Sequence, residues 1–209
     1  MSYLEETQGC IYQERFSIFP CGWWDEAGQK AKPQQRPQQT QTIEWVYEYI
    51  LSSRGRWATE ELRRILPTAT RQQKQDFKAL HFEYATFSGT FSYRNARSLI
   101  ARTPFITLDI DGLASTNEAR DVQHALCADT HIETALCFVS PSGNGLKWIV
   151  RLPECMQDKP FREQFDMMRD YVGFNYGYDP DPSGSDVCRA CYLPWDDQCY
   201  INPNYCLTK

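Results

Sequence analysis

The chain has 209 residues, which is enough for one large or two small domains with a substantial core. Its formal net charge of −5 argues against a protein that is basic throughout, and no run approaches the ~18 apolar residues of a membrane span. The N-terminus has neither the basic start nor the apolar core of a signal peptide, so we expect a cytoplasmic protein with no membrane partner.

The charge is unevenly distributed along the chain. Residues 42–104 contain 10 Lys and Arg against 6 Asp and Glu, whereas residues 105–209 contain 8 against 16. A basic segment beside an acidic one suits a protein that contacts a polyanion and holds a metal ion. A solvated helix face gives the same count, so the pattern alone does not decide.

The nine cysteines are expected to be reduced, because an odd number without a secretory signal does not fit a disulfide framework. Four of them near the C-terminus leave two interpretations open, a zinc site or structural thiols. The wide spacing of the second pair favours structural thiols. These four are Cys188, Cys191, Cys199 and Cys206.

Residues 1–41 are predicted to form an N-terminal strand and a linker. The strand pattern covers Arg15 to Phe19, and residues 25–42 are rich in Gln, Pro and Lys without apolar periodicity. We therefore expect residues 25–42 to be a linker or a long exposed loop, and residues 42–209 to be the functional domain.

The basic part of that domain, residues 42–104, is predicted to be largely helical. The expected elements are a helix capped by Thr42, a second capped by Thr59 and stopped at Pro67, a third over 70–80, a β-rich stretch over 82–91 broken at Gly89, and a short helix over 93–100. Arg94 and Arg97 precede the next strand closely, where they can reach a phosphate of bound nucleic acid.

The metal-site part, residues 105–209, begins with FITLDIDG at 105–112, which reads as a buried strand ending in carboxylates. We expect a helix over 115–128 capped by Ser115 or Thr116, and two strands over 132–139 and 146–152 that form a hairpin beside the first strand. A helix over 161–174, a loop over 178–185 and a strand over 199–202 complete the domain.

Asp109 and Asp111 are the residues most indicative of chemistry. Side chains alternate along a strand, so both carboxylates share one face while Ile110 points into the core. Two adjacent carboxylates repel each other unless a cation lies between them, and Mg²⁺ or Mn²⁺ takes carboxylate oxygens together with substrate phosphates. The simpler alternative is a strand that ends in a turn, where Asp and Gly are common.

Four segments in this order resemble the VirE N-terminal-like domain family, which is similar to a branch of the archaeo-eukaryotic primase, or primase-polymerase, superfamily. The resemblance covers residues 42–202, and four motifs in order are more specific than any one alone. The segments are FSGTF at 87–91, LDIDGL at 108–113, SPSGNGLK at 140–147 and DVCRACYLP at 186–194.

The resemblance implies an α+β fold: a primase-polymerase-like core with an antiparallel sheet like that of an RNA-recognition motif, flanked by helices. It implies that Asp109, Asp111 and Asp186 bind Mg²⁺ or Mn²⁺ and are catalytic. It also implies a nucleotide-binding set in which Lys147 occupies the place of the usual His, so that the charge is kept and the imidazole contact is lost. This set is Ser142, Gly143, Asn144, Gly145, Lys147 and Arg189.

The function implied by the resemblance is metal-dependent nucleotidyl transfer in the replication of a mobile element or phage. The expected partners are nucleoside triphosphates, a single-stranded DNA template and a fused or separate helicase. We expect the template strand to lie along the basic part, residues 42–104, with its bases stacked against an exposed aromatic side chain such as Tyr84 or Trp148.

Two alternatives remain open at this point. The first is a primase-like module that binds single-stranded nucleic acid without turnover, which the acidity and the Lys at position 147 favour. The second is a haloacid-dehalogenase-like phosphatase with Asp109 as nucleophile, against which stand Leu113 in place of the usual Thr and the long segment before the motif.

Overall fold

The computed structural model describes residues 14–206 as a mixed α+β fold in which every strand pairing is antiparallel. Two four-stranded sheets have the orders β11-β5-β1-β4 and β12-β9-β10-β8, and two small sheets pair β2 with β3 and β6 with β7. The strands are β1 (Phe16–Phe19), β2 (Trp23–Trp24), β3 (Ala31–Lys32), β4 (Gln39–Gln41), β5 (Tyr84–Thr86), β6 (Gly89–Phe91), β7 (Leu99–Arg102), β8 (Phe105–Asp111), β9 (Glu133–Val139), β10 (Gly145–Arg151), β11 (Cys191–Tyr192) and β12 (Tyr200–Ile201).

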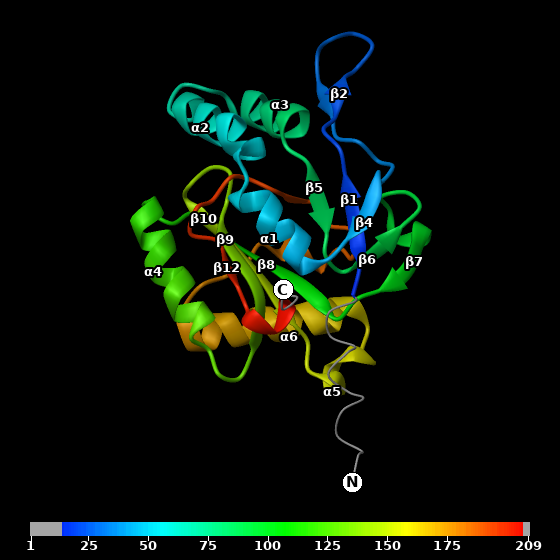
Figure 1. Ribbon diagram of the computed structural model, residues 1–209, viewed down its shortest axis with the longest axis vertical. Helices are drawn as coiled ribbons and strands as arrows, with labels where there is room; N and C mark the ends of the chain where they lie inside the picture. Colours follow the sequence, from blue (N-terminus) through cyan, green and yellow to red (C-terminus); the bar gives the residue numbers. More distant parts are fainter. Residues whose placement is uncertain (1–13, 207–209) are drawn as a thin grey trace.

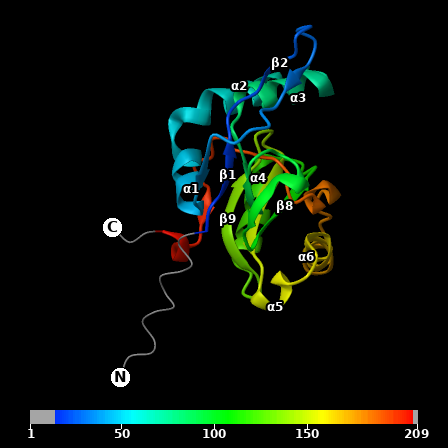
Figure 2. The ribbon, with the colours of Figure 1, turned by 90° about the vertical axis from the view of Figure 1, so that its right-hand side faces the viewer.

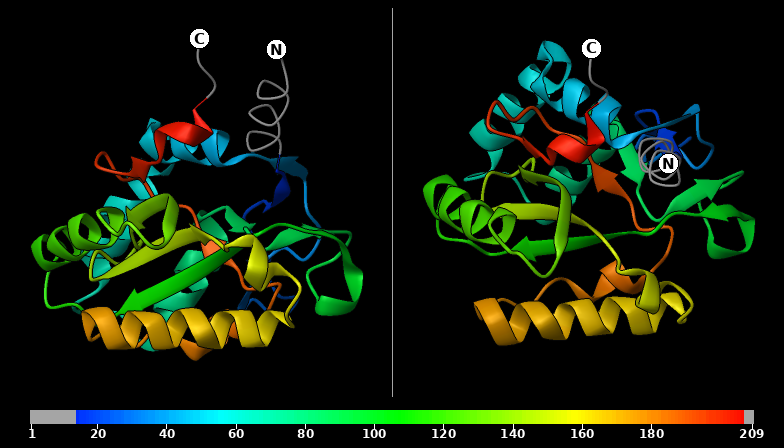
Figure 3. Two further views of the ribbon diagram at one scale, coloured as in Figure 1. Left: turned by 90° about the horizontal axis from the view of Figure 1, so that it is seen from below. Right: turned by 60° about the horizontal axis from the view of Figure 1, so that its bottom comes forward.

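The helices cover both faces of the β8-containing sheet. Figure 2 shows α1 on one side of β9 and α6 on the other, and Figure 3 shows α6 running along the sheet. Within residues 14–206, no helix is both long and apolar enough to cross a membrane. The helices are α1 (Ile43–Leu51), α2 (Arg56–Ile65), α3 (Arg71–His81), α4 (Thr116–Cys127), α5 (Glu154–Gln157) and α6 (Phe161–Tyr176).

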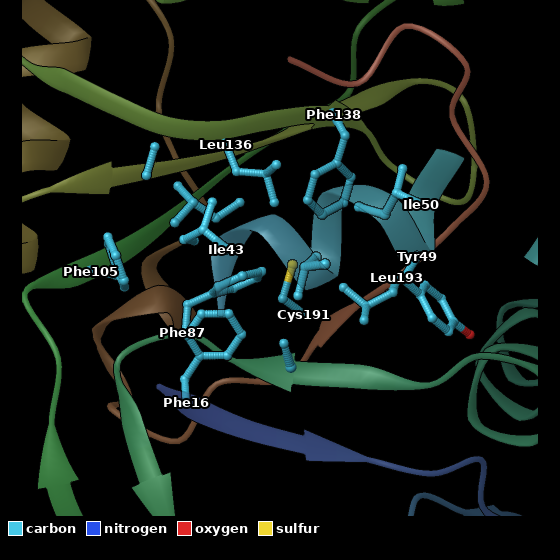
Figure 4. Packing of buried hydrophobic residues seen from close by; sticks show 14 of the residues in the cluster. Phe16, Ile43, Tyr49, Ile50, Phe87, Phe105, Leu136, Phe138, Cys191 and Leu193 are labelled. Carbon is cyan, nitrogen blue, oxygen red and sulfur yellow. The ribbon is translucent and has the colours of Figure 1, made fainter. Parts of the chain in front are cut away.

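The alternation of side chains along β8 gives the sheet two apolar faces. Ile106, Leu108 and Ile110 pack with α4 and α6 in one cluster. Phe105 belongs to a second cluster, which joins this sheet to α1 and to the β1-containing sheet. Figure 4 shows that second cluster closely packed around Phe87 and Phe138. Because odd-numbered residues of β8 face the space between the two sheets, Asp109 and Asp111 lie on that side.

Most elements of residues 105–209 were predicted correctly. The β9–β10 hairpin lies beside β8 over seven paired positions, and Ser115 is the N-cap of α4. Thr42 caps α1 as expected, and Thr70 caps α3 through a reciprocal capping box with Gln73. These elements form locally, from periodicity and caps that lie within a few residues of one another.

Three expectations for the first half need correction. Thr59 does not cap a helix: it lies inside α2, where its hydroxyl donates to the Gly55 carbonyl oxygen at 2.8 Å. The segment 93–100 forms a short 3-10 turn and then strand β7, and the break before β6 precedes Gly89. Thr59 and Gly89, which can end elements, are used inside α2 and at the close contact between β6 and β7, whereas Asn95 caps the 3-10 turn that precedes β7.

The predicted linker is also corrected, because part of it belongs to a sheet. β4 pairs with β1, which pairs in turn with β5, so residues 16–41 share a sheet with residues from the middle and end of the chain. Between them, β2 and β3 form a hairpin that projects at the top of Figure 1 beside α3. Gln-rich strands carry little apolar alternation, which explains why the sequence pattern does not reveal them.

Candidate active site

The register of β8 against β10 places opposite charges across the ladder. Asp109 is paired with Lys147, and Asp111 is paired with Gly145. The Lys147 ammonium contacts the Asp109 carboxylate oxygen Oδ2, and both side chains are largely buried. The two residues that the sequence singled out on adjacent strands are therefore in direct contact.

Gly145 makes room for the second carboxylate. A Cβ atom at this position would lie 2.8 Å from Asp111 Oδ1 and 2.9 Å from the Ile110 carbonyl oxygen, both closer than real Cβ contacts allow. The missing side chain thus lets the Asp111 carboxylate lie over the start of β10.

A third carboxylate comes from the loop that covers the free edge of β8. The Asp181 backbone N–H donates to the Asp109 carbonyl oxygen at 2.8 Å. One oxygen each of Asp109, Asp111 and Asp181 lies within 4.8 Å of the others, and within residues 14–206 this is the group that can hold a metal ion.

Asp186, predicted as the third carboxylate, is not in this group. It is exposed, and its Oδ1 accepts from the Cys188 backbone N–H and thiol, each at 3.1 Å. The structure therefore brings Asp181 to the pair instead. Asp181 is followed by Pro182 and Ser183, and its carboxylate caps the short 3-10 turn that follows; this local capping pattern is the sequence signal that distinguishes it.

The group fits a hard divalent cation. Asp109 Oδ1 is buried and has no hydrogen-bond partner, which is costly unless a ligand completes it. The pKa of Asp111 is raised mainly by partial burial and, to a smaller extent, by repulsion from Asp109. These two causes outweigh the attraction of Lys147, which acts to lower the pKa. A group made of carboxylate oxygens suits Mg²⁺ or Mn²⁺, and Asp109 Oδ1 is free to act as one of the ligands.

Asp109 and Asp111 line a pocket of about 310 Å³ that also carries four cationic side chains, and Asp181 lies beside them outside its lining. Lys147 faces Asp109, and Arg189 donates to Asp181 Oδ2 at 2.9 Å. Lys78 of α3 was not predicted; burial and then repulsion from Lys147 lower its pKa, against the attraction of both aspartates. The four cations are Lys78, Arg94, Lys147 and Arg189.

The predicted nucleotide-binding turn contributes less of the pocket lining than expected. Ser140 and Pro141 line it, whereas the following four residues do not. Arg63 of α2 donates to the carbonyl oxygens of Pro141 (3.3 Å) and Ser140 (3.4 Å), and Thr116 Oγ1 donates to the Gly143 carbonyl at 2.9 Å. These hydrogen bonds connect the turn to α2 and α4. The residues outside the lining are Ser142, Gly143, Asn144 and Gly145.

The two predicted nucleic-acid-binding arginines are separated. Arg94 lines the pocket, where its guanidinium stands 5.5 Å from the Tyr84 ring centroid and its Nε is buried without a hydrogen-bond partner. Arg97 is exposed and does not line the pocket. Only Arg94 is therefore placed to contact a ligand shared with the carboxylates.

Neither aromatic expected to stack against template is available. Tyr84 is 1% exposed and stacks on Phe19, and its hydroxyl donates to the Gln34 carbonyl oxygen. Trp148 is fully buried, and its Nε1 donates to Thr134 Oγ1 at 2.8 Å. Both side chains belong to the core, because each ring is buried and its polar group already has a hydrogen-bond partner.

The four C-terminal cysteines do not form a metal-binding group within the described residues. Burial raises the pKa of Cys191 to about 12 and that of Cys188 to about 11. Both thiols therefore stay protonated at neutral pH in this structure, which agrees with structural thiols.

Comparison with known proteins places the chain in a family without adding a function. No curated protein and no solved structure matches it significantly. The family described as BT4734-like, N-terminal domain matches residues 76–201, which is more than half of the chain and includes all three carboxylates and all four pocket cations. The chain therefore belongs to the family of BT4734-like N-terminal domains.

Proposed function

We propose that this chain is a metal-dependent nucleotidyltransferase of the primase-polymerase type, which takes nucleoside triphosphates and a single-stranded template and works beside a helicase. The observation that carries the proposal is the combination of three carboxylates within 4.8 Å and four cationic side chains in and around one pocket. Phosphoryl-transfer sites need both, because the metal and the phosphates must be bound side by side.

The fold supports the same proposal. β8, α4, β9, β10, α6 and β12 follow in the strand–helix–strand–strand–helix–strand order of a split βαβ unit, on one antiparallel sheet. This order along the chain is also that of a module like an RNA-recognition motif, which the proposed primase-polymerase core would contain. The pairing differs from that motif, in which the last strand pairs with the first: here β12 pairs with β9, so β8 lies at the edge, where the loop carrying Asp181 covers it.

In the proposed reaction Asp109, Asp111 and Asp181 hold Mg²⁺ or Mn²⁺. When bound, the metal would lower the pKa of the attacking 3′-hydroxyl and neutralise phosphate charge. Lys78, Lys147 and Arg189 then balance the negative charge that develops on the triphosphate. Because Lys147 contacts Asp109 in the free protein, it neutralises that carboxylate until a metal binds, and it can then turn to a phosphate.

A second candidate is a nucleic-acid-binding module without turnover. The Lys147 contact with Asp109 favours it, because a Lys that keeps the carboxylate paired opposes metal binding. The two candidates differ in one property, namely whether nucleotide binding depends on metal.

Calorimetric titration with dATP and with ATP, each in Mn²⁺ and in EDTA, tests the proposal. We expect metal-dependent binding that is lost in Asp111→Ala and in Asp181→Ala and retained in Asp186→Ala, the matched control from the same loop. Primer extension with Mn²⁺ should follow the same order.

Three outcomes would contradict the proposal. Binding that is equal in Mn²⁺ and EDTA, with no synthesis, would support the module without turnover. Loss of metal-dependent nucleotide binding in Asp186→Ala but not in Asp181→Ala would show that Asp186, and not Asp181, is the third carboxylate of the site. Hydrolysis of a phosphate ester through an aspartyl-phosphate at Asp109 would instead support the phosphatase.

A further inference from the structure

A groove beside the candidate active site has the chemistry of a single-strand binding surface. It measures about 400 Å³ and is formed by the β2–β3 hairpin and the turn after β6. We define this hairpin groove by Trp23, Lys32, Pro33, Arg36 and Tyr93. Pro33 also lines the carboxylate pocket, so the groove and the pocket share a wall.

The groove presents two aromatic rings to solvent. Trp23 is 46% exposed and Tyr93 is 41% exposed, and within residues 14–206 neither ring packs against another aromatic ring. Single exposed rings are common on protein surfaces, but two exposed rings that line one groove are typical of a binding site. Bases of a single strand are suitable partners, since every base offers a face for stacking.

The groove is also positively charged. Lys32 and Arg36 are exposed in its lining, and no carboxylate belongs to that lining. Within the described chain neither residue forms an ion pair, and neither does Arg94, which stands at the neighbouring pocket. Cations beside stacking rings match a phosphate backbone whose bases are turned toward the protein.

The hairpin is held in a defined position although its rings are exposed. The Gly22 N–H donates to the Ala79 carbonyl oxygen at 2.7 Å, and the Ala31 N–H donates to Asp76 Oδ1 at 2.9 Å. A Cβ atom at Gly22 would lie 2.0 Å from the Lys32 carbonyl oxygen, so only glycine permits this crossing. The hairpin is thus anchored to α3, the helix that supplies Lys78 to the pocket.

We propose that the hairpin groove binds single-stranded nucleic acid by stacking bases on Trp23 and Tyr93, with its phosphates along Lys32 and Arg36, and leads the strand past Pro33 to the carboxylate pocket. This inference rests on the proposed nucleotidyltransferase function for its use, but it makes a separate claim about binding. The hairpin and residues 33–36 precede residue 76, where the family match begins, whereas Tyr93 lies within the match.

The test is fluorescence anisotropy in EDTA without nucleotide, using labelled oligo-dT, oligo-U and a duplex of the same length. A length of about 12 nucleotides lies within the range that one small single-strand-binding fold covers. We expect single strands to bind better than the duplex, and the ratio of oligo-dT to oligo-U affinity to show whether DNA or RNA is preferred.

Variants of the groove should weaken that binding selectively. The double variant Trp23→Ala/Tyr93→Ala should raise the Kd for single strands about tenfold or more, and Arg36→Glu should weaken binding with a shallower salt dependence. The matched controls are Phe174→Ala and Arg162→Glu, an exposed ring and an exposed cation on α6, which should each change the Kd less than about twofold.

Failure of this inference is distinguishable from failure of the proposed function. Three results would overturn the proposal that the groove binds single strands. They are a single-strand Kd that is unchanged in the double variant, a Kd for the duplex equal to that for single strands, and no binding of any oligonucleotide. Metal-dependent nucleotide binding in the double variant should equal wild type, while Asp111→Ala should keep its affinity for single strands. Retained groove binding with no nucleotide binding would uphold the inference and overturn only the proposed function.

Discussion

Asp109 and Asp196 are both buried carboxylates beside the β8-containing sheet, but their surroundings differ. Asp196 accepts two N–H groups of Arg120, the Val139 backbone N–H at 2.8 Å and the Gln198 backbone N–H at 3.1 Å. Asp109 has one cation at Oδ2 and nothing at Oδ1. The Asp196 carboxylate is therefore used by the fold itself, whereas the unpaired Oδ1 of Asp109, at the edge of a pocket, is available to a ligand.

This difference separates the two acidic motifs of the sequence. The second acidic motif is the pair Asp196 and Asp197, and Asp196 forms an ion pair with Arg120 of α4. Substitutions can test whether a carboxylate whose oxygens all have hydrogen-bond partners contributes to stability, and whether one with an unpaired oxygen contributes to binding.

The largest expected effect on stability is that of Asp196→Ala. Removing this carboxylate leaves Arg120, whose side chain is only 15% exposed, with Asp197 at 3.9 Å as its remaining anionic partner, beside neutral hydrogen bonds to Gln123 and Gln198. It also leaves the Val139 N–H unpaired. We expect a loss of about 3–5 kcal/mol in the free energy of unfolding, measured by urea denaturation. Asp197→Ala, whose side chain is 64% exposed, is the control and should cost less than about 0.5 kcal/mol. Equal midpoints for the two variants would contradict the comparison.

Gly145→Ala should affect both stability and the candidate site. The new methyl group meets Asp111 Oδ1 and a backbone carbonyl at distances below 3 Å, so the ladder or the carboxylate must shift. We expect a destabilisation of about 1–3 kcal/mol together with weaker Mn²⁺-dependent nucleotide binding. The matched control is Gly173→Ala in α6, where the methyl group meets only the Tyr178 carbonyl oxygen at 3.7 Å. That variant should stabilise by about 0.5–1 kcal/mol, because Ala is the better helix former.

The sequence predicted the part of the site that lies on paired strands. Asp109 and Asp111 lie on β8 and Lys147 lies on β10, so side-chain alternation, together with the predicted position of the β9–β10 hairpin beside β8, indicates that they meet. Asp181 lies on a loop and Lys78 on α3, and their positions depend on how that loop crosses the β8 edge and how α3 packs. Gly184 marks the loop crossing, since a Cβ there would lie 2.4 Å from the Phe165 ring. A close approach of this kind is visible only once Phe165 and the loop have been placed.

The substitution Lys147→Gln tests whether the contact between Lys147 and Asp109 competes with metal binding. Without the ammonium, Asp109 loses the cation that contacts it and keeps only the more distant Lys78, so metal binding should become stronger and should stabilise the protein more. A tenfold gain in Mn²⁺ affinity would increase the Mn²⁺-induced rise in Tm by roughly 3–6 °C relative to wild type at saturating metal. Nucleotide affinity should fall at the same time, because a phosphate loses one cation. Lys159→Gln, an exposed lysine beside Glu163, should leave both quantities unchanged. A smaller Mn²⁺-induced rise in Tm than in wild type would show that Lys147 does not compete with the metal.

The smallest effect concerns a second completed carboxylate, Asp129. Burial acts to raise its pKa, but hydrogen bonds from the Tyr176 and Tyr171 hydroxyls and from two backbone N–H groups outweigh burial and hold the pKa below the ordinary 3.8. A depressed pKa in the folded state stabilises the protein above pH 3.8 and ceases to do so as the pH falls through the folded-state value. Asp129→Asn should therefore cost about 1 kcal/mol at pH 7, and its difference from wild type should shrink below pH 3.8. The control is Asp121→Asn, an exposed residue of α4, which should change the free energy of unfolding at pH 7 by less than about 0.5 kcal/mol. If the difference at Asp129 stays constant between pH 7 and pH 2.5, the charge of this carboxylate does not stabilise the fold, and completeness of a partner set would no longer separate structural carboxylates from Asp109.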